Sequence, residues 1–193
     1  MARPREFKVE DAVGGAMDVF WEHGYEGASL PDLLSGMGLT RGSLYKAFTD
    51  KKSLYLVVLE RYEQDYVIPA VGLLSGPEIA DGWDRVMALF GNVIADVKKG
   101  DRRGCLACSA AAGPASEDTE IADAVHRTLG KLQKGFEAAL KASQTHAGLD
   151  PAARRQMADM LTTQYVGTRV MARSQAPVAM LKRSVASLRL LVN

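Results

Sequence analysis

Apolar residues recur every three to four positions along almost the whole chain, which is the spacing of one face of an α-helix. The stripes lengthen beyond residue 69, and no segment shows the strict alternation expected of a strand. The first stripe lies within residues 8–23 and consists of Val9, Ala12, Val13, Ala16, Met17 and Phe20. The pattern predicts an all-α protein of about nine helices, without a long linker or an internal repeat.

Residues that favour helix ends divide the N-terminal third into short helices. Gly24 is typical of the left-handed residue that ends a helix. Ser29, Thr40 and Asp50 are expected to cap a second helix, a third through about residue 48, and a fourth beginning at residue 51. Ser116 is expected to cap a long helix in the second half of the chain.

The two short helices meet at the sequence GMGL, residues 36–39, and this arrangement predicts a helix-turn-helix. The second helix of such a unit enters the major groove with its N-terminal residues against base edges. Arg41 can donate two hydrogen bonds to a guanine, and Gly42 allows close approach of the backbone. The other candidates supply hydroxyls or positive charge for double-stranded DNA: Thr40, Ser43, Tyr45, Lys46, Lys51 and, on a short N-terminal arm, Arg3 and Arg5.

The charge distribution fits a local patch and not a basic domain. The whole chain of 193 residues carries a net charge of +1, whereas four basic residues and one acid give residues 40–52 a net charge of +3. The alternative is an ordinary solvated hairpin, in which Tyr45 is a half-buried core aromatic and the two arginines of the arm belong to a frayed tail.

The segment FWEHGYEGASLPDLLSGMGLTRGSLYKAFTDKKSLY resembles the DNA-binding domain of the tetracycline-repressor (TetR/AcrR) family. The resemblance implies a helix-turn-helix domain over residues 1–60 and an effector-binding and dimerisation domain over 61–193. It implies that Ser29, Tyr45 and Lys51 hold phosphates, while residues 40–46 form the recognition helix. Lys52 stands where an acid is common in the family, and we expect it to add charge near the phosphates.

The resemblance also implies a homodimer that binds a palindromic operator and responds to a small-molecule effector. We expect the last two helices to dimerise through apolar stripes, although without the resemblance these stripes would simply be core. Their members are Met157, Leu161, Val170, Met180, Leu181, Val185, Leu188 and Val192.

The large apolar residues of residues 61–193 have two interpretations. Long apolar stripes are normally core, and the functional alternative is an apolar pocket between helices with a few polar groups. The candidates are Met87, Phe90, Phe136 and Tyr165, with Thr162 and Gln164 as polar neighbours.

Cys105 and Cys108 have C-x-x-C spacing, but the further ligands of a zinc site and the βαβ pattern of a thioredoxin site are both missing. They are either two small apolar residues in a tight helix or a sensor. The GCL sequence resembles a subgroup whose cysteine responds to electrophiles or oxidants. Arg102, Arg103 and a helix N-terminus would then lower the pKa of Cys105.

The bulk composition narrows the class of protein. Hydrophobic residues make up 47% of the chain and charged residues 24%, as in globular proteins. No apolar run reaches the roughly 18 residues of a membrane span, and the N-terminus does not resemble a signal peptide. Together with the family resemblance, these features lead us to expect a cytoplasmic transcriptional regulator without a cofactor or metal and not an enzyme. A thiol oxidoreductase and a helical ligand carrier without DNA binding remain the alternatives.

Overall fold

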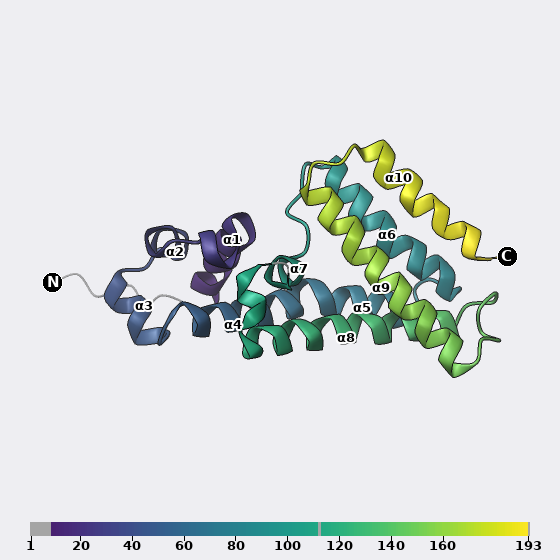
Figure 1. Ribbon diagram of the computed structural model, residues 1–193, viewed down its shortest axis with the longest axis horizontal. Coiled ribbons are helices and arrows are strands. Elements are labelled where there is room, and N and C mark those ends of the chain that lie inside the picture. Colours follow the sequence, from purple (N-terminus) through teal and green to yellow (C-terminus); the bar gives the residue numbers. More distant parts are fainter. Residues whose placement is uncertain (1–8, 112, 193) are drawn as a thin grey trace.

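The computed structural model describes residues 9–111 and 113–192, and in these ranges all regular structure is helical, which confirms the predicted fold class. The elements are α1 (Val9–Gly27), α2 (Leu30–Met37), α3 (Arg41–Ala47), α4 (Lys51–Tyr62), the π-helical segment η1 (Glu63–Val67), α5 (Ile68–Ser75), α6 (Gly82–Lys98), α7 (Leu106–Ala111), the 3₁₀ turn η2 (Pro114–Glu117), α8 (Thr119–Lys141), α9 (Pro151–Arg173), α10 (Val178–Ser187) and the 3₁₀ turn η3 (Leu188–Val192). Figure 1 shows α1, α2 and α3 at one end of the molecule and α6, α9 and α10 at the other, with α4, α5 and α8 running between them.

The helix ends of the N-terminal region follow from local side-chain chemistry. Ser29 and Asp32 form a reciprocal capping box on α2, and Thr40 and Asp50 accept backbone N–H bonds at the starts of α3 and α4. Gly38 ends α2 in the left-handed conformation. These caps confirm the predicted boundaries, except that α1 continues for one turn beyond a break at Gly24, where φ is 74°.

Helices α1 and α2 pack closely because two glycines face each other. A Cβ on Gly15 would collide with the backbone carbonyl of Gly36, and a Cβ on Gly36 would lie 2.5 Å from a methyl group of Val19. The close approach fixes α2 against α1, and Leu33, Leu44 and other buried side chains fill the space between the short helices. The turn and α3 are therefore held on a packed support.

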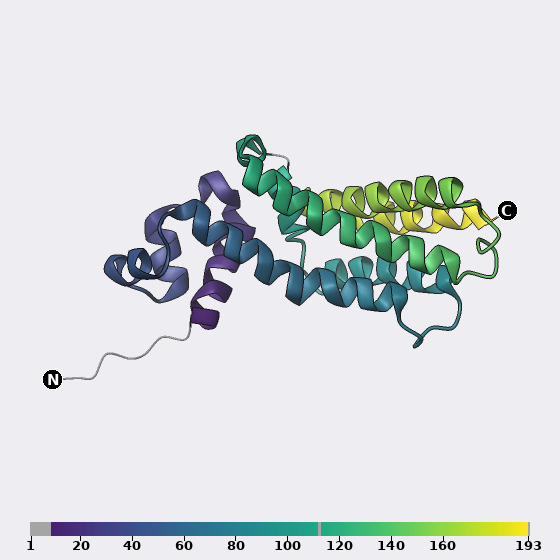
Figure 2. The ribbon, with the colours of Figure 1, turned by 90° about the horizontal axis from the view of Figure 1, so that it is seen from below.

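Helices α4 and α5 form one continuous path through η1, and α8 lies beside this path (Figure 2). Thr128 of α8 donates a hydrogen bond to Glu63 at 3.0 Å, and Lys131 forms an ion pair with the same carboxylate. The predicted domain boundary at residue 60 falls inside α4, so one helix belongs to both halves of the molecule.

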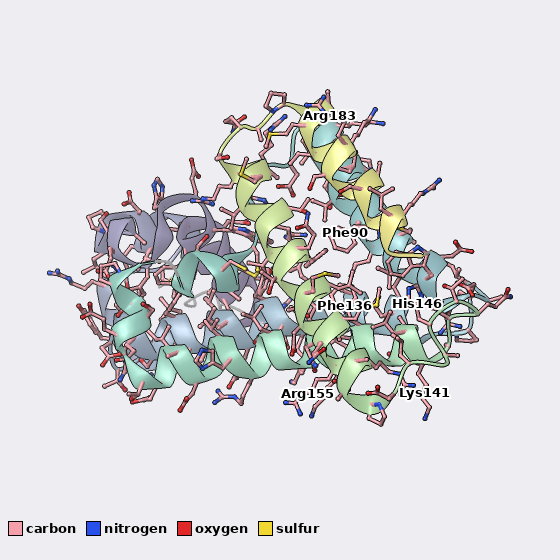
Figure 3. All side chains as sticks on the ribbon, turned by 45° about the vertical axis from the view of Figure 1, so that its right-hand side comes forward. Phe90, Phe136, Lys141, His146, Arg155 and Arg183 are labelled. Carbon is pink, nitrogen blue, oxygen red and sulfur yellow. The ribbon has the colours of Figure 1, made fainter. Side chains whose placement is uncertain are left out.

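The C-terminal bundle consists of α5, α6, α8, α9 and α10 around an apolar core. The rings of Phe90 and Phe136 are fully buried with centroids 6.2 Å apart. Figure 3 shows both rings inside the bundle and Lys141, Arg155 and Arg183 on its outer surface. No helix in the described ranges is long and apolar enough to cross a membrane.

The start of α8 differs from the expectation. Asp118, and not Ser116, accepts the N–H groups of the first turn. Ser116 instead donates its hydroxyl to the carbonyl of Gly113 within η2. The prediction was wrong because Pro114 begins a separate 3₁₀ turn that includes Ser116, and an equally good capping residue follows two positions later.

The last two helices have separate inner and outer faces. Four residues of the expected dimer stripes are buried inside this chain and cannot contact a partner: Leu161, Leu181, Val185 and Leu188. The exposed large apolar side chains of the same region are Met160, Val170, Met171, Met180 and Leu190. Val192 lies where side chains are not described. Any dimer face on α9 and α10 must therefore use the outer set.

Candidate nucleic-acid interface and effector cavity

Helix α3 presents polar and basic groups to solvent while one apolar residue anchors it. Leu44 is buried, whereas Arg41, Gly42, Tyr45 and Lys46 are exposed, Tyr45 by 52%. Neither Arg41 nor Lys46 forms an ion pair with another described residue. The guanidinium and the ammonium therefore remain available to an external anion.

The hydroxyls at the start of α3 are engaged with each other. The Thr40 and Ser43 hydroxyls are 3.0 Å apart, and the Thr40 oxygen also accepts the backbone N–H of Ser43 at 3.3 Å. Ser43 is half-buried. Reading of a base by Ser43 would require this cap to exchange partners, whereas Arg41 needs no such change.

Two lysines at the start of α4 have different surroundings. Lys51 donates to the carbonyl of Glu26 at 3.4 Å and lies 5.0 Å from the ring centre of Tyr25, and its partial burial lowers its pKa. Lys52 forms ion pairs with Asp118 at 3.1 Å and Glu120 at 2.8 Å. The expectation that Lys52 adds charge near the phosphates was wrong, because α8 supplies two acids that hold it. Arg3 and Arg5 lie outside the described residues.

A cavity of about 390 Å³ lies among α4, η1, α5, α6, α8 and α9. We call it the effector cavity after the role proposed for it below. Its wall is mostly apolar with a few polar groups, as in small-molecule sites. The lining residues include Tyr62, Asp65, Tyr66, Leu73, Leu89, Asn92, Asp96, Cys105, Leu129, Tyr165 and Arg169. A more open hollow of about 500 Å³ between α1, α4 and α8 is lined mainly by charged and polar side chains.

The predicted pocket residues divide into two groups. Cys105 and Tyr165 line the effector cavity, whereas Met87, Phe90, Phe136 and Cys108 are not among its lining residues. Phe90 and Phe136 do not line the cavity because they pack in the core behind Tyr165. Their ring centroids lie 5.6 and 6.3 Å from the centroid of the Tyr165 ring. Thr162 and Gln164 are also outside the lining and bond to Ala158 and Ser184.

Cys105 immediately precedes α7, and its sulfur accepts a hydrogen bond. The Tyr62 hydroxyl donates to the Cys105 Sγ at 3.2 Å, and the carbonyl of Cys105 accepts the N–H of Ser109 at 3.0 Å. The pKa of Cys105 is lowered from 9.0 to about 6, and the main cause is the neighbouring Cys108 thiol. Burial of Cys105 acts in the opposite direction and raises the pKa. Tyr62, Arg169 and the backbone of Cys108 lower it further. The neighbouring Cys105 thiol and burial raise the pKa of Cys108. Cys105 is therefore the thiol that ionises first.

Arg169 is the cation beside this thiol. Its guanidinium donates to the carbonyl of Gly104 at 3.2 and 2.6 Å and to the Tyr165 hydroxyl at 3.2 Å. The expected roles of Arg102 and Arg103 were wrong. Arg102 bonds to backbone carbonyls at the end of α9, and Arg103 pairs with acids at positions 18 and 101. A residue distant in sequence supplies the charge that the neighbours were expected to provide.

Tyr62 also connects the cavity with α1. Its ring stacks on Tyr66 at 5.3 Å, and the edge of Trp21 contacts both rings, at 5.2 and 4.8 Å between centroids. The Arg103 guanidinium lies 4.2 Å from the centre of the Trp21 ring. Arg173 of α9 donates to the carbonyl of Trp21 at 2.7 Å. The side chain of Tyr62 therefore links the Cys105 sulfur to Trp21 of α1.

Comparison with known proteins places these features in a family. Residues 13–58 match the model described as bacterial regulatory proteins, tetR family. The TetR family transcriptional regulator CifR, solved with a 26-base-pair operator duplex, is 30% identical, with 96% of this chain and 99% of that chain covered and a TM-score of 0.78. The chain belongs to the TetR family. It is accordingly a DNA-binding transcriptional regulator.

Other TetR family relatives agree over different lengths. The repressor ComR of Escherichia coli is 45% identical over 60 residues, which span 31% of this chain and only 29% of ComR. The regulator YezE of Bacillus subtilis is 28% identical over 137 residues, or 70% of each chain. The reduced form of NemR from Escherichia coli shares the fold, with a TM-score of 0.80 over 92% of each chain at 20% identity.

Three residues of this TetR family chain that matter to the thiol were not identified from sequence: Tyr62, Arg169 and Trp21. Each stands on an amphipathic helix among other aromatic or basic residues, where a core or surface role is equally consistent with the spacing. Only the packing of α4, α7 and α9 shows that Tyr62 and Arg169 meet Cys105. The cysteine itself was the one sequence signal at this site.

Proposed function

We propose that this chain is an effector-responsive repressor that binds a palindromic operator as a dimer and releases it when the effector cavity is occupied or Cys105 reacts. One observation carries the proposal: α4 follows directly on the exposed α3 and ends at Tyr62, whose hydroxyl holds the Cys105 sulfur in the cavity wall. A change at the cavity can therefore alter the support of the DNA-reading helix.

The exposed side chains of α3 define the expected contacts with DNA. Arg41 reads a guanine through two hydrogen bonds, and Lys46 and Tyr45 contact phosphates. Ser29, Thr40, Gly42, Ser43 and Lys51 are the further candidates for contacts with the DNA backbone in this proposal. In a two-fold dimer the two α3 helices meet major-groove faces about 34–36 Å apart, which gives the operator its palindromic form.

The outer faces of α9 and α10 are the dimer surface in this proposal. Met160, Val170 and Met171 are exposed along α9, with Gly167 between them, whose position leaves open space for a close neighbour. Met180 adds an exposed apolar group on α10. Helical pairs that pack across a two-fold axis typically use such stripes.

The effector in this proposal is a small, mainly apolar compound or a thiol-reactive one. The cavity volume of about 390 Å³ is near the lower end of small-molecule sites, which span roughly 300–1,000 Å³. Cys105 is reachable from the cavity and has a thiol that is largely ionised at neutral pH. A ligand shifts the equilibrium only through its different affinity for the DNA-binding and released states.

Selection of bound sequences from a random duplex pool, with the reduced protein, tests the DNA-binding part. We expect a palindromic sequence whose affinity falls steeply with salt. Arg41→Ala and Lys46→Ala should each weaken binding, while Lys141→Ala at the far end of the bundle should not (Figure 3). Selected sequences without dyad symmetry, or equal affinities for all three variants, would refute this part.

A further inference from the structure

Cys105 immediately precedes α7 and Cys108 lies in its first turn, so the two buried thiols are three residues apart at the start of this helix. Both side chains are less than a tenth exposed, and the nearby Cys108 thiol lowers the pKa of Cys105. Residues three apart on a helix have Cα atoms about 5 Å apart, which is inside the range of about 4.4–6.8 Å that disulfides require. This spacing therefore allows a disulfide between Cys105 and Cys108 without movement of the neighbouring helices.

We infer that Cys105 and Cys108 form a redox-active dithiol, in which Cys105 reacts with a hydroperoxide from the cavity and Cys108 closes an intramolecular disulfide. The inference rests on the proposed function and deepens it, because it assigns a defined oxidised product to the sensor. Of the two cysteines, Cys105 lines the cavity and Cys108 does not. This placement assigns the attacking role to Cys105 and the resolving role to Cys108.

The first step is attack of the Cys105 thiolate on one oxygen of the hydroperoxide. A sulfur–oxygen bond forms, the oxygen–oxygen bond breaks, and the departing alkoxide takes a proton from solvent to become an alcohol, or water where the oxidant is hydrogen peroxide. Cys105 becomes a sulfenic acid and has been oxidised by two electrons, which the peroxide accepts. The donors around the sulfur, Tyr62 and Arg169, favour the thiolate that this step needs.

In the second step the Cys108 sulfur attacks the sulfenic acid sulfur. The disulfide bond forms, the sulfur–oxygen bond breaks, and hydroxide leaves as water with the proton of the Cys108 thiol. The charge on Cys105 disfavours ionisation of Cys108 in the reduced protein. Oxidation of Cys105 removes that charge, so the resolving thiol is activated after the first step and not before it.

The disulfide changes the surroundings of Tyr62. A disulfide sulfur carries no negative charge and is a weaker hydrogen-bond acceptor than a thiolate, so the Tyr62 hydroxyl loses its partner. The Tyr62 ring packs against Tyr66 of η1 and Trp21 of α1. The oxidised state is therefore communicated to the π-helical segment and to the helix that supports the DNA-reading domain.

Intact-mass measurement of the full-length chain after addition of hydrogen peroxide tests this inference. Wild type should lose two hydrogens without becoming a covalent dimer, and a reductant should restore the mass. Cys108→Ser should instead gain oxygen atoms, as a cysteine without a resolving partner does. Cys105→Ser should react far more slowly than either.

Two results would overturn the inference: oxygen addition without loss of hydrogens in wild type, or equal reaction rates for Cys105→Ser and wild type. Circular dichroism of the reduced variants establishes that each is folded, and Tyr62→Phe should slow the first step without abolishing the disulfide. Operator binding by the reduced protein requires neither thiol to react. A failure of the dithiol chemistry is therefore distinguishable from a failure of the proposed DNA-binding function.

Discussion

Replacement of Tyr62 by Phe isolates the hydrogen bond that links α4 to the Cys105 sulfur. The substitution removes one hydroxyl and leaves the ring, which is buried and stacked on Tyr66. A hydrogen bond to a charged acceptor contributes about 1.5–3 kcal/mol, and each pKa unit corresponds to about 1.4 kcal/mol. Loss of the bond should therefore raise the pKa of Cys105 from about 6 by roughly one to two units.

The sign follows from which form the hydroxyl stabilises. Tyr62 donates to the sulfur and favours the thiolate, so its removal favours the neutral thiol. At a pH equal to the pKa of the background thiol, that is Cys105 with Tyr62 intact, the ionised fraction should fall from about one half to between roughly one tenth and one hundredth, a decrease of about five- to fifty-fold. At a pH well above the pKa of both proteins, the variant and its background should react at similar rates, because both thiols are then ionised.

The rate of alkylation by iodoacetamide between pH 4 and 9 measures this shift directly. All variants should carry Cys108→Ser as their common background, so that Cys105 is the single thiol that reacts. This substitution will itself raise the pKa of Cys105, because it removes the group that lowers this pKa most. Tyr66→Phe is the matched control. It removes a hydroxyl from the ring stacked on Tyr62, and the hydroxyl that donates to the Cys105 sulfur is that of Tyr62. The groups from other elements that face the thiol, Tyr165 and Arg169, remain unchanged. Superimposable profiles for Tyr62→Phe and its background would refute the reasoning.

Three further outcomes are expected. Gly15→Ala should lower the free energy of unfolding in urea by about 1–3 kcal/mol, because its Cβ meets the backbone of α2. Gly14→Ala is the control: open space surrounds this position, so the variant should be neutral or more stable by up to about 1 kcal/mol. Equal effects of the two substitutions would contradict the glycine contact. Lys52→Ala should lower the stability only slightly, and less in high salt, because its ion pairs with α8 are exposed to solvent. The same variant should keep an operator affinity close to that of wild type, and a loss as large as that of Lys46→Ala would contradict this placement. Val170→Glu should give a monomer in light scattering, because it places a charge on the outer face of α9 where 48% of the valine is exposed; an unchanged dimer would move the interface elsewhere.

The N-terminal region could be predicted in detail because its signals are local. A capping residue acts on N–H groups within three positions, so Ser29, Thr40 and Asp50 mark helix starts without knowledge of the rest of the fold. Exposure of Arg41 and Lys46 follows in the same way from the helical position of Leu44. The sequence therefore predicted both the helix-turn-helix and its polar face.

The sensor region could not be predicted to the same depth because its contacts join distant segments. Lys52 was expected near DNA, but its partners follow 66 and 68 positions later, at the start of α8. Arg169 and Tyr62 are each separated from Cys105 by a long stretch of chain, and helical periodicity gives no register between helices. Spacing identified the cysteine pair, while the donors that set its pKa needed the packed structure.

The central claim is that the chemical state of Cys105 controls the affinity of α3 for DNA. The most direct test is fluorescence anisotropy of a labelled operator duplex, titrated with protein before and after alkylation by iodoacetamide. Wild type and Cys108→Ser should lose affinity on alkylation, while Cys105→Ser should bind as tightly after treatment as before. Undiminished binding by alkylated wild type, or an equal loss in Cys105→Ser, would contradict the account.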